Sequence, residues 1–202
     1  MNPSIQTSAN GPEGTVSYFI PSPVFSGRPE NPDGRLPVEL RTYDLLDSLS
    51  IPYSRIDHDA TATIEGCEEV EKVLGVHICK NLFLCNAQKT AFYLLMMPGH
   101  KKFKTKTLSR QIQSARLSFA DAEYMKRFLD ITPGSVSVLG LANDTDGHVR
   151  LLIDSDVLKD EFVGCHPCIN TSSLRLRTDD LLSRFLPAVH HEYTTVTLPW
   201  EE

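Results

Sequence analysis

The chain has 202 residues and a net charge of -6, with 41% hydrophobic and 23% charged residues. This composition is typical of a globular protein, and the length allows one sizeable domain, or one domain plus a small appendage. No apolar run approaches the roughly 18 residues that span a bilayer, and the first residues lack the basic and apolar regions of a signal peptide. Because five cysteines, an odd number, do not predict a disulfide scaffold, we expect a reduced, cytoplasmic protein.

Residues 1–36 form the first distinct segment. They contain six of the thirteen prolines and little hydrophobic periodicity, which predicts an extended or partly disordered N-terminal arm. Within this arm, the short apolar piece at 16–20 could still add a strand. We expect the domain itself to span residues 37–187, and residues 188–202 to form a C-terminal tail.

Hydrophobic spacing and turn residues predict the elements of the domain. In chain order they are a helix over about 36–49, a strand over 53–58, a helix over 64–74, a hairpin of strands over 79–86 and 91–97, a short helix over 107–114, a helix over 119–129, two strands within 133–154 joined by the turn 143–147, a strand over 168–177 and a helix over 179–186. The expected N-caps are Thr63, Ser118 and Thr178, and Gly75 should stop the second helix. Because strands and helices interleave, we predict a single α/β (α+β) domain with a mixed β-sheet flanked by helices.

The segment 99–116, called the basic segment below, differs in charge from the rest of the chain. It carries six cations and no acidic residue, which predicts a local positive patch of the kind that binds nucleic acid. The alternative is a solvated loop and helix face. The six cations are Lys101, Lys102, Lys104, Lys106, Arg110 and Arg116.

The sequence Cys165-His166-Pro167-Cys168 is the most conspicuous short motif. A C-x-x-C pair can be a redox site or half of a zinc site. Redox pairs of the thioredoxin kind precede a helix, whereas the residues after Cys168 have the pattern of a strand. A zinc site needs four ligands, and the sequence contains no second C-x-x-C and no H-x-x-x-H. We therefore predict neither a metal nor a cofactor.

Lys80 and Asn81 open a strand whose next three residues are wholly apolar. A lysine at the mouth of a buried strand has to extend toward water, pair with a partner or serve a site. A second candidate is the turn Pro133-Gly134-Ser135, where backbone N–H groups and the Ser135 hydroxyl could point at a ligand. An ordinary turn is the simpler interpretation of this second pattern.

Four motifs follow one another in the order found in a known family. They are KNLFL at 80–84, ARLSFAD at 115–121, PGSVS with GL and ND at 133–144, and HP with NT at 166–171. Together they resemble the free-standing prolyl-tRNA editing proteins, the PrdX-type branch of the YbaK superfamily, over residues 38–187. The resemblance implies a YbaK-like editing-domain fold and the hydrolysis, in trans, of alanine mischarged onto proline tRNA.

The same resemblance implies roles for individual residues. The catalytic residues that it implies are Lys80, Asn81 and His166. The substrate-binding residues that it implies are Gly134, Ser135, Val136, Leu141, Asn143, Pro167, Asn170 and Thr171. The basic segment would then hold the acceptor stem of the tRNA. The sequence departs from the family pattern in its cysteines on both sides of His166-Pro167 and in valine at 138, where a proline is common; both changes leave the proposed catalytic groups in place.

The partners that the resemblance implies are the acceptor end of mischarged tRNA(Pro) and, as a candidate, prolyl-tRNA synthetase; we expect neither a membrane nor DNA as a partner. Hydrolysis of an activated aminoacyl ester depends on a positioned water, a cation and polar donors rather than on a strong nucleophile. Three alternatives remain open. The chain could deacylate another mischarged tRNA, carrying cysteine or serine; it could be a non-catalytic module that binds tRNA or a synthetase; or it could be a thiol-redox protein that uses Cys165 and Cys168.

Overall fold

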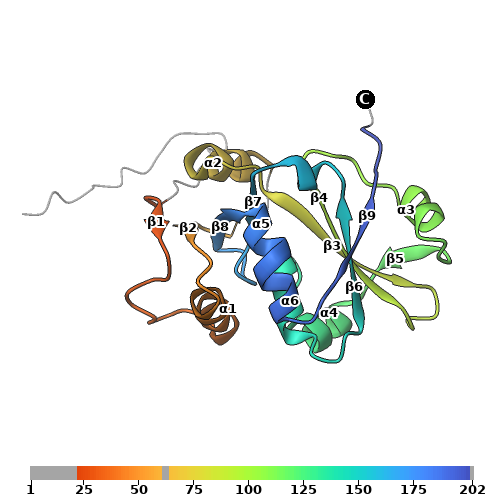
Figure 1. The fold of residues 1–202 in the computed structure, drawn as a ribbon, viewed down its shortest axis with the longest axis horizontal. Coiled ribbons are helices and arrows are strands. Elements are labelled where there is room, and N and C mark those ends of the chain that lie inside the picture. The colour runs from red at the N-terminus through yellow and green to blue at the C-terminus, as the bar shows by residue number, and fades with distance from the viewer. Residues whose placement is uncertain (1–21, 61–63, 201–202) are drawn as a thin grey trace, which may run out of the picture.

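The computed structural model describes residues 22–60 and 64–200, which fold into two β-sheets flanked by helices (Figure 1). The strands are β1 (Phe25–Ser26), β2 (Tyr53–Asp57), β3 (Cys79–Asn86), β4 (Phe92–Pro98), β5 (Leu117–Phe119), β6 (Val149–Asp154), β7 (Phe162–Cys165), β8 (Ser172–Arg177) and β9 (Tyr193–Val196). The helices are α1 (Pro37–Ser48), α2 (Ile64–Leu74), α3 (Thr105–Gln111), α4 (Ala122–Leu129), the 3-10 helices η1 (Val138–Asn143) and η2 (Val157–Lys159), and a continuous C-terminal helix made of α5 (Thr178–Asp180), the π-helical η3 (Leu181–Phe185) and α6 (Leu186–Ala188). None of these helices is long and apolar enough to cross a bilayer.

The larger sheet has five strands in the order β5-β3-β4-β6-β9 and is mixed. β3 pairs antiparallel with β4 and β5, whereas β4 with β6 and β6 with β9 are parallel. The smaller sheet is antiparallel, in the order β1-β2-β8-β7. The N–H of Gly164 donates to the carbonyl O of His77, 3.2 Å away, so the two sheets meet where β3 begins beside β7.

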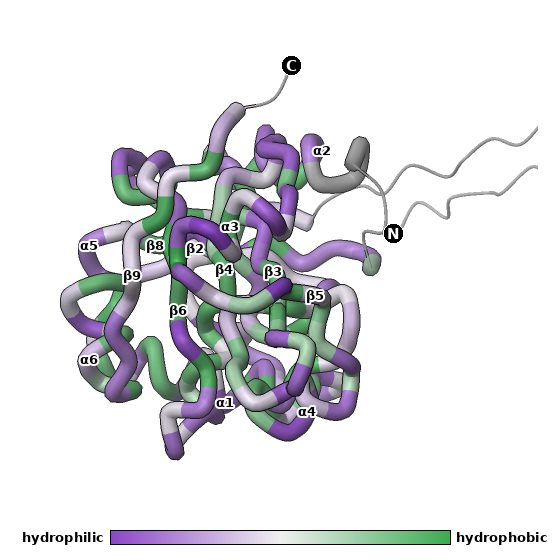
Figure 2. Tube along the Cα trace, turned by 90° about the vertical axis from the view of Figure 1, so that its right-hand side faces the viewer, coloured by the Kyte–Doolittle hydropathy of each residue, from purple (hydrophilic) through white to green (hydrophobic). Residues whose placement is uncertain are grey.

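The five-stranded sheet is covered on both faces. On one face Phe83 and Leu94 point into the main core, which α1, α4 and the C-terminal helix complete. On the other face Leu84 packs in a second core with Leu108 of α3 and with Leu198. Because successive side chains of a strand point to opposite faces, a strand buried on both sides is apolar throughout, as β4 is. In Figure 2 much of this sheet is accordingly hydrophobic, while the loops at its ends are largely hydrophilic.

Most predicted elements are present. α1, β2 and α2 coincide with the predicted ranges to within one or two residues, and α2 ends before Gly75 as expected. The β3–β4 hairpin and the strand β8 are also confirmed, and α3 begins two residues before its predicted start. The expected mixed sheet is present, together with a second, antiparallel sheet. The proposed N-cap Thr63 lies outside the described residues.

The prediction of a helix over 119–129 with Ser118 as its cap is wrong at its start. Leu117–Phe119 pairs with β3 as the edge strand β5, so the helix α4 begins only at Ala122, with Asp121 as the N-cap residue. The sheet hydrogen bonds that β3 offers on its free edge therefore outweigh the helical preference of these residues.

Three further predictions are corrected toward the C-terminus. The first apolar stretch of 133–154 is the 3-10 helix η1 rather than a strand, and the Ser137 hydroxyl caps it by accepting from the N–H of Leu139. Thr178 is not an N-cap, because it is the first helical residue and its hydroxyl donates to the carbonyl O of Asp160. β9 lies in the predicted tail. Only Val196 of its four residues is buried, so the sequence shows no alternation of buried and exposed residues that would identify a strand.

The last part of the predicted N-terminal arm is attached to the domain. β1 pairs with β2, and the Arg35 guanidinium bonds to Glu39 and Asp57 at 2.5 and 2.7 Å. Burial alone would raise the pKa of Asp57, but hydrogen bonds from Arg35 and Arg55 lower it to about 2. The apolar piece at 16–20 lies outside the described residues.

Candidate active site

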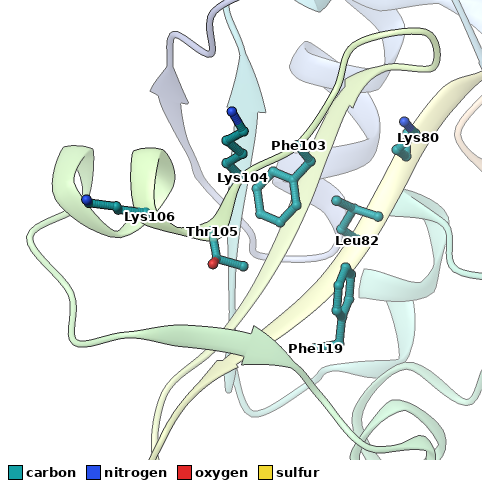
Figure 3. Close-up of a pocket in the computed structure, with 7 residues that line it drawn as sticks. All are labelled: Lys80, Leu82, Phe103, Lys104, Thr105, Lys106 and Phe119. Atoms are coloured by element: carbon teal, nitrogen blue, oxygen red, sulfur yellow. The ribbon is translucent and has the colours of Figure 1, made fainter. Parts of the chain in front are cut away.

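Lys80, the proposed catalytic lysine, lines a pocket of about 540 Å³ at the start of β3. Its Nζ donates a hydrogen bond to the carbonyl O of Lys101, 3.1 Å away, and partial burial lowers the pKa of its ammonium group. Figure 3 shows the side chains of Leu82, Phe103 and Phe119 gathered between β3, β5 and the loop before α3. The remaining lining residues are Lys104, Thr105 and Lys106. Three lysines thus line the pocket beside an apolar wall, although the side chain of Lys106 extends away from this wall in Figure 3. This combination suits an anionic ligand that carries an apolar or aromatic part.

Asn81 points to the opposite face of the sheet from Lys80. Lys80 pairs with Met97, which belongs to the second core, whereas Asn81 pairs with Met96, which belongs to the main core. The side-chain N–H₂ of Asn81 donates to the carbonyl O of Cys79, but its Oδ1 is buried and accepts no hydrogen bond from the described residues. An unpaired buried acceptor costs free energy, so the Asn81 Oδ1 is a candidate acceptor for an N–H or O–H group of a ligand.

His166 lies in a polar cluster of the smaller sheet. Its Nδ1 is 2.9 Å from the carbonyl O of Ser172, which can only accept, so Nδ1 carries the proton and Nε2 is an acceptor. Burial lowers the pKa of His166, which keeps the ring neutral at physiological pH. Beside it, His58 Nδ1 donates to the carbonyl O of Asp59 and His58 Nε2 accepts from the hydroxyl of Ser173 at 2.8 Å, with the two imidazole centroids 6.1 Å apart.

The segment 133–137, which begins with the predicted turn at 133–135, lies beside the segment 166–171. The Ser137 hydroxyl donates to the carbonyl O of His166 at 2.5 Å. Gly134 has φ +88°, a conformation that favours glycine, and a Cβ at this position would lie 3.5 Å from the side-chain N of Asn170. Ser135 and Pro167 are buried, whereas Thr171 is exposed. The structure therefore brings together two of the segments that the sequence proposed for substrate binding.

Other proposed binding residues have structural contacts. Leu141 is buried in the main core, against which Val136 packs. The side-chain N of Asn143 donates to the carbonyl O atoms of Leu129 and Gly140, where it connects the end of α4 to η1. If Leu141 or Asn143 contributes to substrate binding, it therefore does so by holding η1 and the end of α4 in place.

The prediction that all six cations of the basic segment face the tRNA is wrong for Lys101. Its side chain is fully buried, and its Nζ lies 2.9 Å from Asp154 Oδ2 and 2.8 Å from Asp156 Oδ2. Its positive charge is thus neutralised inside the protein and cannot contact a phosphate. The other five cations, Lys102, Lys104, Lys106, Arg110 and Arg116, are exposed.

The two cysteines of the C-x-x-C motif are buried, and each is a free thiol. Burial raises the pKa of Cys168 to about 12 and that of Cys165 well above its ordinary value. Since the thiolate is the reactive form, these side chains behave as core residues rather than as a redox pair.

Several residues of this region were not singled out from the sequence. Phe103 and Phe119 form the apolar wall of the Lys80 pocket, and His58 and Ser173 complete the His166 cluster. A histidine at the end of a predicted strand was the one signal that pointed to His58. Nothing in the spacing of the two phenylalanines shows that they meet, since Phe119 was expected to begin a helix.

Comparison with known proteins gives consistent matches. The family described as "Aminoacyl-tRNA editing domain" matches residues 58–183. The "Prolyl-tRNA editing protein ProX" of Acetoanaerobium sticklandii is 35% identical over 136 residues, covering 67% of this chain and 83% of that protein. The "Prolyl-tRNA synthetase associated domain-containing protein 1" of Mus musculus is 30% identical over 152 residues, covering 73% of this chain and 88% of that protein. A solved protein proposed to be a trans-editing enzyme for prolyl-tRNA synthetase superposes with a TM-score of 0.58 at 16% identity, over 81% of this chain and 99% of that one, which shows a shared fold.

Proposed function

Because this chain belongs to the aminoacyl-tRNA editing domain family, we propose that it is a trans-acting deacylase that hydrolyses mischarged Ala-tRNA(Pro). The observation that carries the proposal is the pocket of Lys80, which Lys104 and Lys106 also line beside an apolar wall. The terminal nucleotides of a tRNA offer phosphates for such cations and flat bases for such a wall. The name of the 35% identical relative supports proline tRNA as the substrate.

In this proposal Lys80 binds a phosphate near the 3′ end of the tRNA. An ammonium group has three N–H donors, and one of those of Lys80 is bonded to Lys101, which leaves two for a ligand. If the 3′ end of the tRNA crosses the start of β3, its aminoacyl group lies on the face of the sheet to which Asn81 points. There the unpaired Oδ1 of Asn81 can accept a hydrogen bond from the α-amino group of the substrate.

His166 is proposed to orient the attacking water or the terminal ribose. Its neutral ring presents Nε2 as an acceptor because Nδ1 is bonded to the carbonyl O of Ser172. The ester of an aminoacyl-tRNA is already activated, so orientation and polar donors account for most of the required acceleration. We assign no general base to the protein, because the ribose hydroxyl next to the ester can take part in the proton transfer.

The preference for alanine follows from size. A synthetase pocket built for proline excludes the smaller alanine weakly, because a missing methylene costs only about 1–3 kcal/mol. A second site too small for proline discriminates by steric exclusion instead. The turn at Gly134 beside Asn170 is the proposed wall of that second site.

The test is a deacylation assay on the purified chain with Ala-, Pro-, Cys- and Ser-tRNA(Pro). We expect Ala-tRNA(Pro) to be hydrolysed at least about tenfold faster than Pro-tRNA(Pro), which corresponds to roughly 1.4 kcal/mol of discrimination. Faster hydrolysis of the cysteine or serine ester would assign a different substrate. Rates no higher than spontaneous hydrolysis for all four, with tRNA binding intact, would identify a non-catalytic binding module.

The exposed lysines of the basic segment should make tRNA binding salt-dependent. If Lys102, Lys104 and Lys106 are replaced together by Gln, up to three phosphates lose their cation. The slope of log affinity against log salt should then become less negative by about 0.7–0.9 for each such phosphate. All tRNAs should be weakened alike, because phosphate contacts position a nucleic acid without reading its sequence. Filter binding across a salt series measures both effects.

The matched control is the triple variant Lys89→Gln, Lys126→Gln, Lys159→Gln, which changes the net charge equally at exposed sites outside the basic segment. It should keep most of the affinity and salt slope. Equal losses in both triple variants would mean that only overall charge matters. A changed ratio of Ala- to Pro-tRNA(Pro) hydrolysis in the first variant would contradict the separation of tRNA binding from amino-acid specificity.

A further inference from the structure

Three potential metal ligands from separate segments meet beside the start of β3. They are Glu71 in the last turn of α2, His77 in the loop that follows, and His100 in the loop after β4. One ligand atom from each lies within 4.8 Å of the others. The sequence showed no such set, because His100 is 29 residues from Glu71 and the loops alone bring them together.

The carboxylate of Glu71 is held in a fixed orientation between the two imidazoles. Its Oε1 accepts from the N–H of Ile78 at 2.8 Å. Its Oε2 lies 3.3 Å from His77 Nδ1 and 3.2 Å from His100 Nε2, and the two rings are nearly perpendicular. Two ligand atoms of a tetrahedral zinc site with bonds of about 2.0–2.1 Å are roughly 3.3 Å apart, so the two oxygen–nitrogen distances already fit such a site.

The surroundings also suit a cation. Glu71 is 11% exposed, while the side chains of His77 and His100 are 76% and 49% exposed, so the ligands line an open pocket of about 490 Å³. Of the two other charged residues that line the pocket, Glu68 adds a negative charge and Lys72 pairs with Glu69. A metal ion therefore has both a charged ligand and an entry path.

The loop that carries His100 comes close to the start of β3 because residue 99 is a glycine. A Cβ at this position would lie 2.5 Å from the carbonyl O of Ile78, a distance that real Cβ atoms do not show. Glycine thus allows the loop after β4 to come close enough to the start of β3 for His100 to reach Glu71.

We propose that Glu71, His77 and His100 bind a divalent transition-metal cation of the zinc type, with a water molecule as the fourth ligand. Two imidazoles and one carboxylate are a common zinc ligand set with three protein groups. The ion would connect α2, the start of β3 and the loop 99–101. Since Lys80 donates to Lys101 in that loop, metal binding would stiffen the backbone around the lysine pocket.

The test is a titration of the chelator-treated full chain with Zn²⁺ by calorimetry, and with Co²⁺ by its visible absorption. We expect one equivalent of either metal ion to bind. His77→Asn and Glu71→Gln should each weaken binding by about tenfold or more, since changes to residues that only support ligands already cost that much. Glu71→Gln keeps an oxygen for the N–H of Ile78.

The control is His190→Asn, which removes an exposed histidine outside the cluster at a positive φ that asparagine also adopts. It should bind Zn²⁺ like the wild type. The proposal is overturned if the wild type binds no equivalent of either metal, or if His77→Asn binds as tightly as His190→Asn. In either case the carboxylate of Glu71 only accepts hydrogen bonds from the two imidazoles. Because His77 is largely exposed, its variant should fold even if Glu71→Gln does not.

Discussion

The Lys80→Ala variant should hydrolyse Ala-tRNA(Pro) about 100- to 1000-fold more slowly than the wild type, measured as kcat/KM. Removing one preorganised donor from an active site typically costs about 2.7–4 kcal/mol of transition-state stabilisation. The fold should survive, because Lys80 is only partly buried and loses a single hydrogen bond, from its charged ammonium group to the carbonyl O of Lys101, which contributes about 1.5–3 kcal/mol.

The matched control for this experiment is Lys89→Ala. Lys89 is an exposed lysine in the turn of the same hairpin, at the end away from the pocket. It should deacylate at close to the wild-type rate. A folded Lys80→Ala variant with a similar rate would remove Lys80 from the catalytic site, and Lys80→Arg would then be expected to behave in the same way.

Lys101→Met should reduce the free energy of unfolding by about 3–5 kcal/mol, the range found when one partner of a buried ion pair is removed. Both Lys101 and Asp154 have side chains with no exposed area, so the substitution would leave the Asp154 carboxylate buried without its counter-ion. Urea denaturation, extrapolated to water, measures the change.

Two further variants make this result specific. Lys102→Met changes the exposed neighbour and should alter stability by no more than about 0.5 kcal/mol. Lys101→Met combined with Asp154→Asn removes both charges but keeps an oxygen for the backbone N–H groups of Asp156 and Leu198. The double variant should be more stable than Lys101→Met alone; equal losses would show that packing, rather than the unpaired charge, explains the effect.

The sequence predicted elements with strong periodicity and missed those that depend on distant partners. α1 and the β3–β4 hairpin carry their own pattern of buried residues, so their positions were predictable. The position of β5 was not predictable, because its three residues form a strand only by pairing with the free edge of β3. β9 likewise depends on β6, a strand about 40 residues earlier in the chain.

The same limit applies to the candidate site. Lys101 belongs to a run of cations that predicts an exposed patch, and its burial depends on Asp154, which is 53 residues away. Lys80 and Asn81 are neighbours in sequence, yet strand alternation directs them to opposite faces of the sheet. The segments around Gly134 and His166 lie side by side, and the sequence grouped them only because the family resemblance proposed both for one site, a relation that spacing alone does not contain.

The parallel pairing of β9 with β6 has a consequence for folding during translation. Asp154 at the end of β6 accepts a hydrogen bond from the N–H of Leu198, and the indole N–H of Trp200 donates to Asp156. The five-stranded sheet, and the closed surroundings of the Lys101–Asp154 pair, can therefore form only once residues 193–200 have left the ribosome tunnel. Domains generally fold as units, so the nascent chain should keep β6 as an unpaired edge until residues 193–196 have emerged. A chaperone that shields exposed strand edges would find its target there.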